Sequence, residues 1–339
     1  MRLFGSLDEA SKAIVEVGLE QWHDELLAQG RPTVRYTVDN MRDGAAGIGA
    51  SCMGGTPDLP PNMDWPLRPP YVDATVRNAE VRDHEAIKLR SLDFRLRNDR
   101  ARRLMGTDAR LPFVAQIDLA KAWRIQKFDV ELPKGGRLLF FYDARESPPG
   151  FDRADAAAFR VIWDETPISA LVRAAAPAEL VIDALVFPQK TLCAAPGYAL
   201  PDWETFAYER IGMPLSELEK YGKLRDTYGE AETLSEVEWR GHHYLGGWGD
   251  RLSGASADME LECELVSTGV STGRHYPKDA EDRARSRRAD WCLLAQFDCG
   301  EVATAGLEHE WLTGRRLYFW IRREDLALRR FESVWVLTR

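Results

Sequence analysis

Two short stretches of this chain carry a glutamine and an aspartate at the same spacing. Residues 111–118 read Leu-Pro-Phe-Val-Ala-Gln-Ile-Asp, and residues 291–298 read Trp-Cys-Leu-Leu-Ala-Gln-Phe-Asp. If the two aspartates approach each other, their carboxylates form a pair suited to general acid–base catalysis. If each stretch is instead a buried strand, its glutamine amide must be hydrogen-bonded inside the protein.

The residues concerned are Gln116 and Asp118 in the first copy, and Gln296 and Asp298 in the second. Strand side chains alternate, so the glutamine and aspartate of each copy lie on one face. The apolar neighbours favour two structural amides, each clamping a loop such as the Gly-Gly-Pro segment. The competing interpretation is a cleft between two halves of the chain, lined by both pairs. All four residues are candidate ligand-binding groups.

Three further residues complete the candidate ligand-binding set. His242 and His243 are adjacent, and an imidazole titrates near neutral pH, so either could work with Asp118 or Asp298 as an acid–base pair. Trp65 lies in a loop rich in proline. A tryptophan there either plugs the edge of a core, which we favour, or faces a ligand.

Other motifs give weaker signals. Residues 269–273 fit G-x-S-x-G, but no buried strand before them or helix after them is expected, so a nucleophile elbow is disfavoured. The histidines and cysteines lack the spacing of a zinc site. Neither a P-loop nor a complete dinucleotide-binding fingerprint occurs. We therefore expect no metal and no cofactor.

The bulk composition restricts the possible partners. The chain has 339 residues, 45% of them apolar, and a net charge of −9, which argues against nucleic acid or an anionic membrane as partner. The N-terminus turns acidic before any apolar run, unlike a signal peptide, and no run is apolar enough to span a bilayer. Five dispersed cysteines without a CxxC pair predict reduced thiols and a cytoplasmic location.

Local patterns predict most of the elements. Residues 6–29 are expected to form one helix, since Ser6 and Glu9 have the spacing of a capping box. Prolines between positions 57 and 70 predict a rigid extended loop. Residues 259–265 alternate apolar residues with glutamates, which predicts a half-exposed strand. The further expected strands are 33–38, 113–119, 138–142 (a central strand), 158–163, 180–187 and 331–337, with another helix at 214–226.

The repeated spacing predicts an internal duplication. Gln116 and Gln296 lie 180 residues apart, and Gly135 and Gly314 lie 179 apart. We expect an α+β fold, predominantly antiparallel β, with two similar β-rich halves about a pseudo-twofold axis and an N-terminal helix. The expected organisation is an N-terminal helix at 1–32, a first β-rich repeat at 33–190 with a charged insertion at 77–110, a helical connector at 191–240 and a second β-rich repeat at 241–339.

Several motifs in a fixed order carry a family resemblance. They are Gly-Gly-Thr-Pro-Asp-Leu-Pro at 54–60 with Trp-Pro at 65–66, the stretch 111–118, Leu-Pro-x-Gly-Gly-x-Leu-x-Phe-Phe at 132–141, and the second-half stretches 258–267, 290–298 and 314–322. Together they resemble the bacterial YwqG-like family (domain of unknown function 1963) over roughly residues 33–337. The resemblance implies a duplicated, mostly β fold and no defined activity. The chain departs from the family pattern after Gly246 and at Cys299-Gly300.

Three functional hypotheses follow. The first is a cytoplasmic, non-enzymatic binding protein, of the immunity or antitoxin type or a ligand-recognition protein, whose partner is an unknown protein or a small polar ligand. The second is an enzyme of unknown reaction that uses the aspartates and histidines in a cleft between the repeats. The third is a structural or assembly module, suggested by the many aromatic residues, among them 11 tryptophans.

Overall fold

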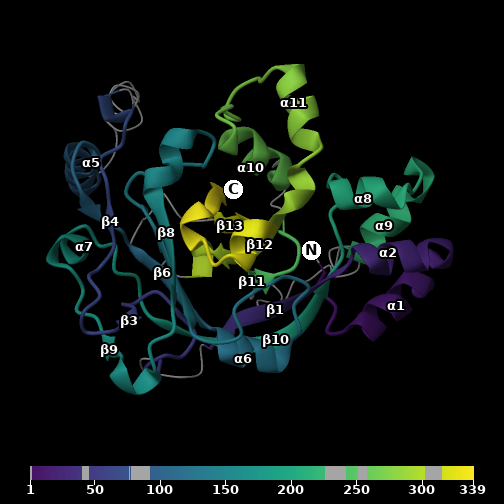
Figure 1. The fold of residues 1–339 in the computed structure, drawn as a ribbon, viewed down its shortest axis with the longest axis horizontal. Helices are drawn as coiled ribbons and strands as arrows, with labels where there is room; N and C mark the ends of the chain where they lie inside the picture. The colour runs from purple at the N-terminus through teal and green to yellow at the C-terminus, as the bar shows by residue number, and fades with distance from the viewer. Residues whose placement is uncertain are drawn as a thin grey trace.

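One antiparallel sheet of ten strands forms the framework of the protein. The computed structural model describes residues 2–39, 46–75, 77, 92–225, 242–250, 258–301 and 315–339. The strand order is β14-β13-β12-β11-β1-β10-β2-β6-β7-β8. The sheet is strongly curled, nearly into a barrel, and helices surround it (Figure 1). The fold is therefore α+β and predominantly antiparallel β, as the sequence predicts.

The ten strands are β1 (Arg31–Val38), β2 (Cys52–Met53), β6 (Phe113–Asp118), β7 (Arg137–Tyr142), β8 (Phe159–Asp164), β10 (Lys190–Ala199), β11 (His243–Gly246), β12 (Trp291–Asp298), β13 (Arg316–Arg322) and β14 (Trp335–Thr338). Two small sheets pair β3 (Asp58–Leu59) with β9 (Val172–Arg173), and β4 (Leu67–Arg68) with β5 (Ala109–Arg110). The helices are α1 (Leu7–Glu16), α2 (His23–Gln29), α5 (Leu92–Met105), α6 (Leu119–Ile125), α7 (Ala178–Ile182), α8 (Phe206–Ile211), α9 (Leu218–Arg225), α10 (Met259–Ser267), α11 (Lys278–Arg285) and α12 (Arg323–Ala327).

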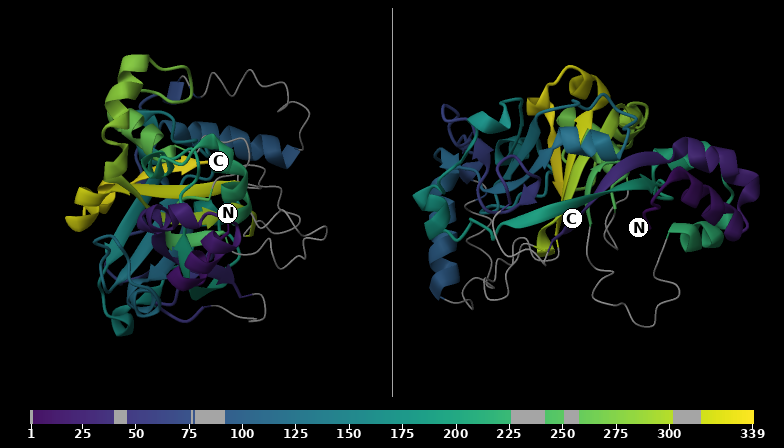
Figure 2. Two further views of the ribbon diagram at one scale, coloured as in Figure 1. Left: turned by 90° about the vertical axis from the view of Figure 1, so that its right-hand side faces the viewer. Right: turned by 90° about the horizontal axis from the view of Figure 1, so that it is seen from below.

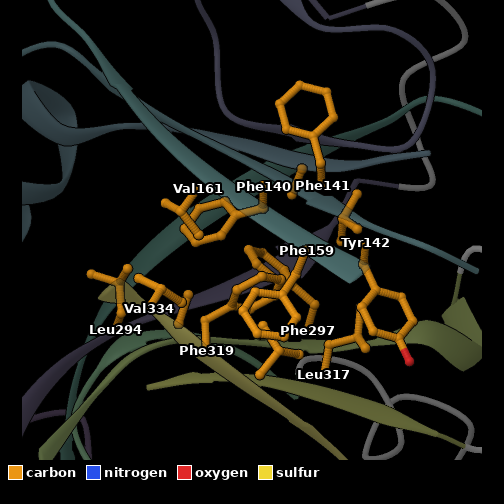
Figure 3. Close-up of a cluster of buried hydrophobic side chains, with 14 of the residues drawn as sticks. Phe140, Phe141, Tyr142, Phe159, Val161, Leu294, Phe297, Leu317, Phe319 and Val334 are labelled. Carbon is orange, nitrogen blue, oxygen red and sulfur yellow. The ribbon is translucent and has the colours of Figure 1, made fainter. Parts of the chain in front are cut away.

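The main core lies between the two ends of the curled sheet. The ring of Phe140 on β7 lies 5.0 Å from Phe297 on β12 and 4.9 Å from Phe319 on β13. Figure 3 shows these side chains facing one another across the interior. Every residue of β7 is buried, and the strand lies between β6 and β8, which confirms the prediction of a central strand. Burial on both faces explains why this strand is apolar throughout.

Trp65 plugs the outer face of the first half, where the proline-rich loop covers β6 and β7. Its indole N–H donates to the carbonyl of Leu111 at 2.7 Å, and its ring meets Phe141 edge-on at 6.1 Å. Phe141 points away from the central cluster in Figure 3, toward this loop. The side chain is buried and its one polar atom is satisfied, as in the interpretation that we favour from the sequence.

The N-terminal segment forms two helices rather than the single helix predicted for residues 6–29. Helix α1 ends at Glu16, and the backbone turns at Gly18, whose φ of +74° is accessible to glycine without strain. The Ser6 hydroxyl accepts a hydrogen bond from the N–H of Glu9, but the Glu9 carboxylate bonds to Gly5 instead of Ser6. Helices α1 and α2 gather with α8 and α9 at one end of the molecule (Figure 2).

The prediction of a strand at residues 180–187 is wrong. Helix α7 occupies 178–182, and the strand follows it as β10, whose residues 192–199 pair with β1. Pro196 and Gly197 lie inside β10, and both residue types normally indicate a strand end. The segment 191–240 therefore begins with a central strand before the helices α8 and α9.

Residues 259–266 are wholly buried in a helix, which corrects the predicted half-exposed strand. The 3.6-residue period places Met259 and Cys263 on the main core, whereas Leu261 and Leu265 pack against α11. The intervening glutamates are not exposed to solvent. Their carboxylates face arginines from distant elements, as with the ion pair of Glu264 and Arg322, so the apolar–charged alternation resembles a strand without being one.

Several other expectations are confirmed in part. Strands occur at 113–118, 159–164 and 335–338, where strands are predicted at 113–119, 158–163 and 331–337, and α9 falls within the predicted helix 214–226. In the charged insertion 77–110, residues 92–105 form α5, and residues 78–91 lie outside the described residues. The described residues also exclude 226–241, at the end of the predicted connector, and 302–314, which include Gly314. No helix in the described part of the chain is long and apolar enough to cross a membrane.

Candidate functional site

Gln116 clamps the loop that precedes Asp58. Its carbonyl oxygen accepts from the backbone N–H of Asp58 at 3.0 Å, and its amide group donates to the carbonyl of Ala50 at 2.8 Å. The amide also meets the Asp58 carboxylate at 2.6 Å, and Arg173 Nε binds the other carboxylate oxygen at 2.6 Å. Gln116 and Asp58 have no exposed surface. All of this hydrogen bonding is internal, as expected of a structural amide.

Gln296 makes the corresponding contacts in the second half. Its carbonyl oxygen accepts from the N–H of Asp250 at 2.8 Å, and its amide group donates to the carbonyl of His242 at 2.9 Å. In both halves, the clamped loop contains two consecutive glycines with positive φ, namely Gly54-Gly55 and Gly246-Gly247. Only glycine adopts this conformation without strain, which explains the glycine pairs in the sequence.

Asp118 and Asp298 each end their strand and hold the turn that follows. Asp118 Oδ1 accepts from the N–H of Lys121 at 3.0 Å and caps α6. Asp298 Oδ1 accepts from the N–H of Gly300 at 2.9 Å, and its other oxygen lies 3.3 Å from Arg316 Nε. These are local capping roles, in which a carboxylate satisfies N–H groups at a helix or turn start.

The two Gln-x-Asp pairs are not brought together. Strands β2, β10, β1 and β11 separate β6 from β12 in the sheet. Phe297 points into the central core, so Gln296 beside it faces the opposite side of its strand. Each glutamine contacts its own loop. Among the described residues, no cleft is lined by both pairs, and an acid–base pair of Asp118 with Asp298 is not formed.

The two histidines have different environments. His243 is fully buried, and its Nδ1 accepts from the N–H of Asp298 at 3.0 Å, so that nitrogen carries no proton. His242 is partly accessible, and its Nδ1 lies 2.6 Å from Asp250 Oδ2. A carboxylate can only accept, so Nδ1 of His242 is protonated. Asp250 thus orients one imidazole, in the manner of a carboxylate that holds a catalytic base.

Asp250 is a buried carboxylate that sequence reasoning missed. Burial acts to raise its pKa, but the hydrogen bond from His242 and the charge of Arg316, 2.8 Å away, hold the pKa below its usual range. A signal for it exists in the sequence. Asp58 follows Gly54 by four residues, and Asp250 follows Gly246 by four.

A second missed feature is a pocket of about 640 Å³ at the end of the first-half strands, which we term the aromatic pocket. Its walls come from α6, the 126–136 loop, the end of β8 and the turn after α12. Gly246 lies against Phe128, since a Cβ added there would stand 3.1 Å from that ring. The lining residues are Trp123, Phe128, Asp129, Val130, Glu131, Leu132, Pro133, Lys134, Gly135, Trp163, Glu165 and Arg329.

Two indoles of the aromatic pocket are fixed by the backbone of one loop. Trp123 Nε1 donates to the carbonyl of Pro133 at 2.9 Å, and Trp163 Nε1 donates to that of Gly135 at 3.0 Å. In the sequence, the Leu-Pro-Lys-Gly-Gly stretch indicates only a turn before a strand. Its role as a wall follows from contacts with Trp163 and Arg329, which are distant in the chain, and local patterns contain no trace of such contacts.

The family model described as "Domain of unknown function (DUF1963)" matches residues 51–338 of this chain. The match spans both Gln-x-Asp strands and every residue that lines the aromatic pocket. No curated protein matches the chain.

Proposed function

The chain belongs to the DUF1963 family, whose function is unassigned, and we propose that it is a non-enzymatic binding protein that takes a small ligand into the aromatic pocket. The pocket itself carries the proposal. Its volume of about 640 Å³ falls within the range of small-molecule sites, and three aromatic rings with a charged rim line it. Arg329 of the second half also lines the pocket, and Phe128 of the first half packs against Gly246 of the second.

A blocking variant tests this function. Gly135 lines the pocket, has ordinary backbone angles, and an added side chain there meets no atom within 4 Å. We expect Gly135→Trp to fill the pocket without disturbing the fold. Purified wild-type protein, incubated with a small-molecule extract of its source cells, should retain a ligand detectable by native mass spectrometry, and the Gly135→Trp variant should not.

The matched control is Gly106→Trp, because Gly106 also has free space around it and lies outside the aromatic pocket. This variant should retain the same ligand as wild type. Wild-type protein that retains no small molecule, or a Gly135→Trp variant that still retains the ligand, would refute the proposed function.

We also propose that the two halves are an internal duplication. The matched hydrogen bonds of Gln116 and Gln296 support it, as does the strand order, in which β2-β6-β7-β8 and β11-β12-β13-β14 flank the central pair β1 and β10. Both β6 and β12 also carry a register shift just before their glutamine. It lies between Phe113 and Ala115 in β6, and between Leu293 and Ala295 in β12.

Equivalent glutamines should have equivalent energetic roles. Gln116→Leu and Gln296→Leu each leave a buried N–H and a buried carbonyl unpaired, so each variant should lose roughly 2–4 kcal/mol of unfolding free energy. Urea unfolding measures both. Losses that differ by more than about 2 kcal/mol would contradict a shared role.

An enzyme is the second candidate, and the His242–Asp250 hydrogen bond of 2.6 Å is the observation that favours it. Asp250 replaces Asp118 and Asp298 as the carboxylate partner in this proposal. A hydrolysis screen with ester and phosphoester substrates tests it: activity that His242→Gln abolishes and that Gly135→Trp leaves intact would select the enzyme over the binding protein. We also propose a cytoplasmic location, which the five free thiols support.

A further inference from the structure

The aromatic pocket presents three aromatic rings beside charged side chains. The rings of Trp123 and Phe128 meet almost at right angles, at 77° with centroids 5.2 Å apart, and so form two walls of a corner. Trp163 adds a third ring. Both indole N–H groups already donate to backbone carbonyls of the 126–136 loop. The two indoles therefore offer a ligand their electron-rich π surface and not their N–H groups.

The protein's own cations already lie over these rings. Lys134 Nζ is 5.6 Å from the centroid of Trp123, and the Arg329 guanidinium is 5.8 Å from that of Trp163. Both distances are within the range of about 6 Å over which cation–π attraction acts. Arg329 has a left-handed φ of +62°, which is uncommon for a residue with a side chain, and its guanidinium donates to the carbonyls of Glu131 and Leu326.

Carboxylates at the rim match the basic side chains in number once Asp129 is counted with its partner Arg31. Asp129 lies 4.0 Å from Arg31, whereas the exposed carboxylates of Glu131 and Glu165 form no ion pair within the described residues. The rim holds three acidic and two basic side chains. The exposed carboxylates of Glu131 and Glu165 would repel an anionic ligand. Its main hydrogen-bond donor would be Lys134, because Arg329 already donates to backbone carbonyls.

We propose that the aromatic pocket binds a small organic cation with an alkylated ammonium group, an inference that rests on the proposed function. The ammonium lies in the corner of Trp123 and Phe128, where it takes the place of Lys134 Nζ over the indole. Glu131 and Glu165 attract it electrostatically from the rim. Alkyl groups on nitrogen suit such a site because they lower the cost of removing the cation from water.

Calorimetry with tetramethylammonium chloride as probe tests the proposal. Sodium chloride at equal concentration controls for ionic strength, and 2,2-dimethylpropanol serves as a neutral compound of similar shape. We expect tetramethylammonium to bind and the neutral compound to bind at least about five-fold more weakly. Binding should be lost in Gly135→Trp and kept in Gly106→Trp.

Charge variants give a test with opposite signs. Glu131→Gln and Glu165→Gln should each weaken tetramethylammonium binding by about two- to five-fold, because each removes one attractive charge at a solvated rim. Lys134→Met should strengthen binding by a similar factor, because it removes a like charge and the cation that occupies the ring. Glu16→Gln, an exposed glutamate of α1, should change nothing.

The outcomes separate the ligand class from the function. Absence of tetramethylammonium binding, equal binding of the neutral compound, or weaker binding in Lys134→Met would overturn the cationic ligand. If inorganic phosphate or glucose binds instead, and Gly135→Trp blocks that binding, the cationic ligand is also overturned. The proposed binding function would then still stand. Failure of the function itself appears separately, as the absence of any small molecule retained from the cell extract.

Discussion

Glu260 is a buried carboxylate whose Oε1 has no hydrogen-bond partner among the described residues. Burial, assisted by the charge of Asp258, raises its pKa from 4.5 to about 8, and Arg31 acts in the opposite direction. Arg31 is itself buried and lies 3.4 Å over the ring of Trp248, and burial lowers its pKa to about 10. Two ionisable groups are thus held in the interior with incomplete hydrogen bonding, which is costly for their charged forms.

This carboxylate predicts a pH dependence of stability. The folded protein holds the Glu260 proton more tightly than the unfolded chain, so the free energy of unfolding falls as the pH rises from about 4.5 to about 8. The contribution amounts to a few kcal/mol at most, at about 1.4 kcal/mol per pKa unit. In Glu260→Gln this part of the fall should disappear.

Urea unfolding at pH 5 and at pH 8.5 measures the effect. The variant should gain stability relative to wild type at pH 8.5, and the difference should shrink at pH 5. Burial also raises the pKa of Glu146, to about 7, but that contribution is common to both proteins and cancels in the comparison. The prediction would be contradicted if the unfolding free energies of wild type and variant differed by the same amount at both pH values.

At the scale of elements, α10 depends on arginines that come from elsewhere in the chain. Glu264 accepts from Trp291 Nε1 at 2.9 Å and pairs with Arg322 of β13, and Glu262 pairs with the C-terminal residue Arg339. The helix starts at Asp258, whose side chain accepts from the N–H of Leu261 at 3.0 Å. Glu262 and Glu264 can be buried as charged groups because these arginines neutralise them.

Removal of one such charge distinguishes the helix from the predicted strand. In a half-exposed strand, Glu264 would face water and Glu264→Ala would be nearly silent. In α10 the substitution leaves the indole N–H of Trp291 without its acceptor and removes the buried carboxylate that pairs with Arg322, so we expect a loss of about 2–4 kcal/mol in urea unfolding. Glu16→Ala, an exposed glutamate of α1, is the control and should cause no measurable change.

At the scale of the whole molecule, the curled sheet is closed by contacts between its two ends. Trp335 of β14 donates from Nε1 to the carbonyl of Gly150 at 2.9 Å, and Thr338 donates from its backbone N–H to the carbonyl of Pro149 at 3.1 Å. The ring of Phe159 on β8 lies 5.3 Å from that of Trp335. The last strand of the chain therefore packs directly on the end of the first half.

Gly150 permits this closure. Its φ is +81°, and an added Cβ would stand 1.9 Å from the carbonyl oxygen of Val336, closer than any real contact. Gly150→Ala should therefore cost about 3 kcal/mol or more, from the strained backbone together with displacement of β14. Gly212→Ala is the matched control, because Gly212 also has a positive φ of +70° but free space around it, and should cost about 1 kcal/mol.

Calorimetric unfolding measures both glycine variants. Because closure joins the two ends of the sheet, wild type should unfold in one transition, and Gly150→Ala should lower the midpoint well below that of Gly212→Ala. Equal midpoints for the two variants would show that the contact between β14 and the 149–150 loop contributes little.

The strands that carry the sheet are predictable from their residues alone. Leu111–Asp118, Leu138–Tyr142 and Trp291–Asp298 are apolar on both faces, and a stretch of that kind is stable only as a central strand. The glutamines could be predicted as buried amides, since a polar group among such residues requires internal partners. The family could be identified as well, because its motifs are local and ordered.

The remaining features depend on partners distant in the chain, so local patterns could not predict them. The alternation in Met259–Leu265 fits a strand. It occurs in a buried helix because Arg322 pairs with Glu264 and Arg339 pairs with Glu262. Strand β10 keeps Pro196 and Gly197 because β1 pairs along it. The aromatic pocket likewise combines Trp123 and Phe128 with Trp163 and Arg329, which lie far from them in the sequence. The role of Asp250 beside His242 also depends on the distant Gln296 and Arg316. Local patterns specify which groups must be buried, and the packing of distant segments specifies what they meet.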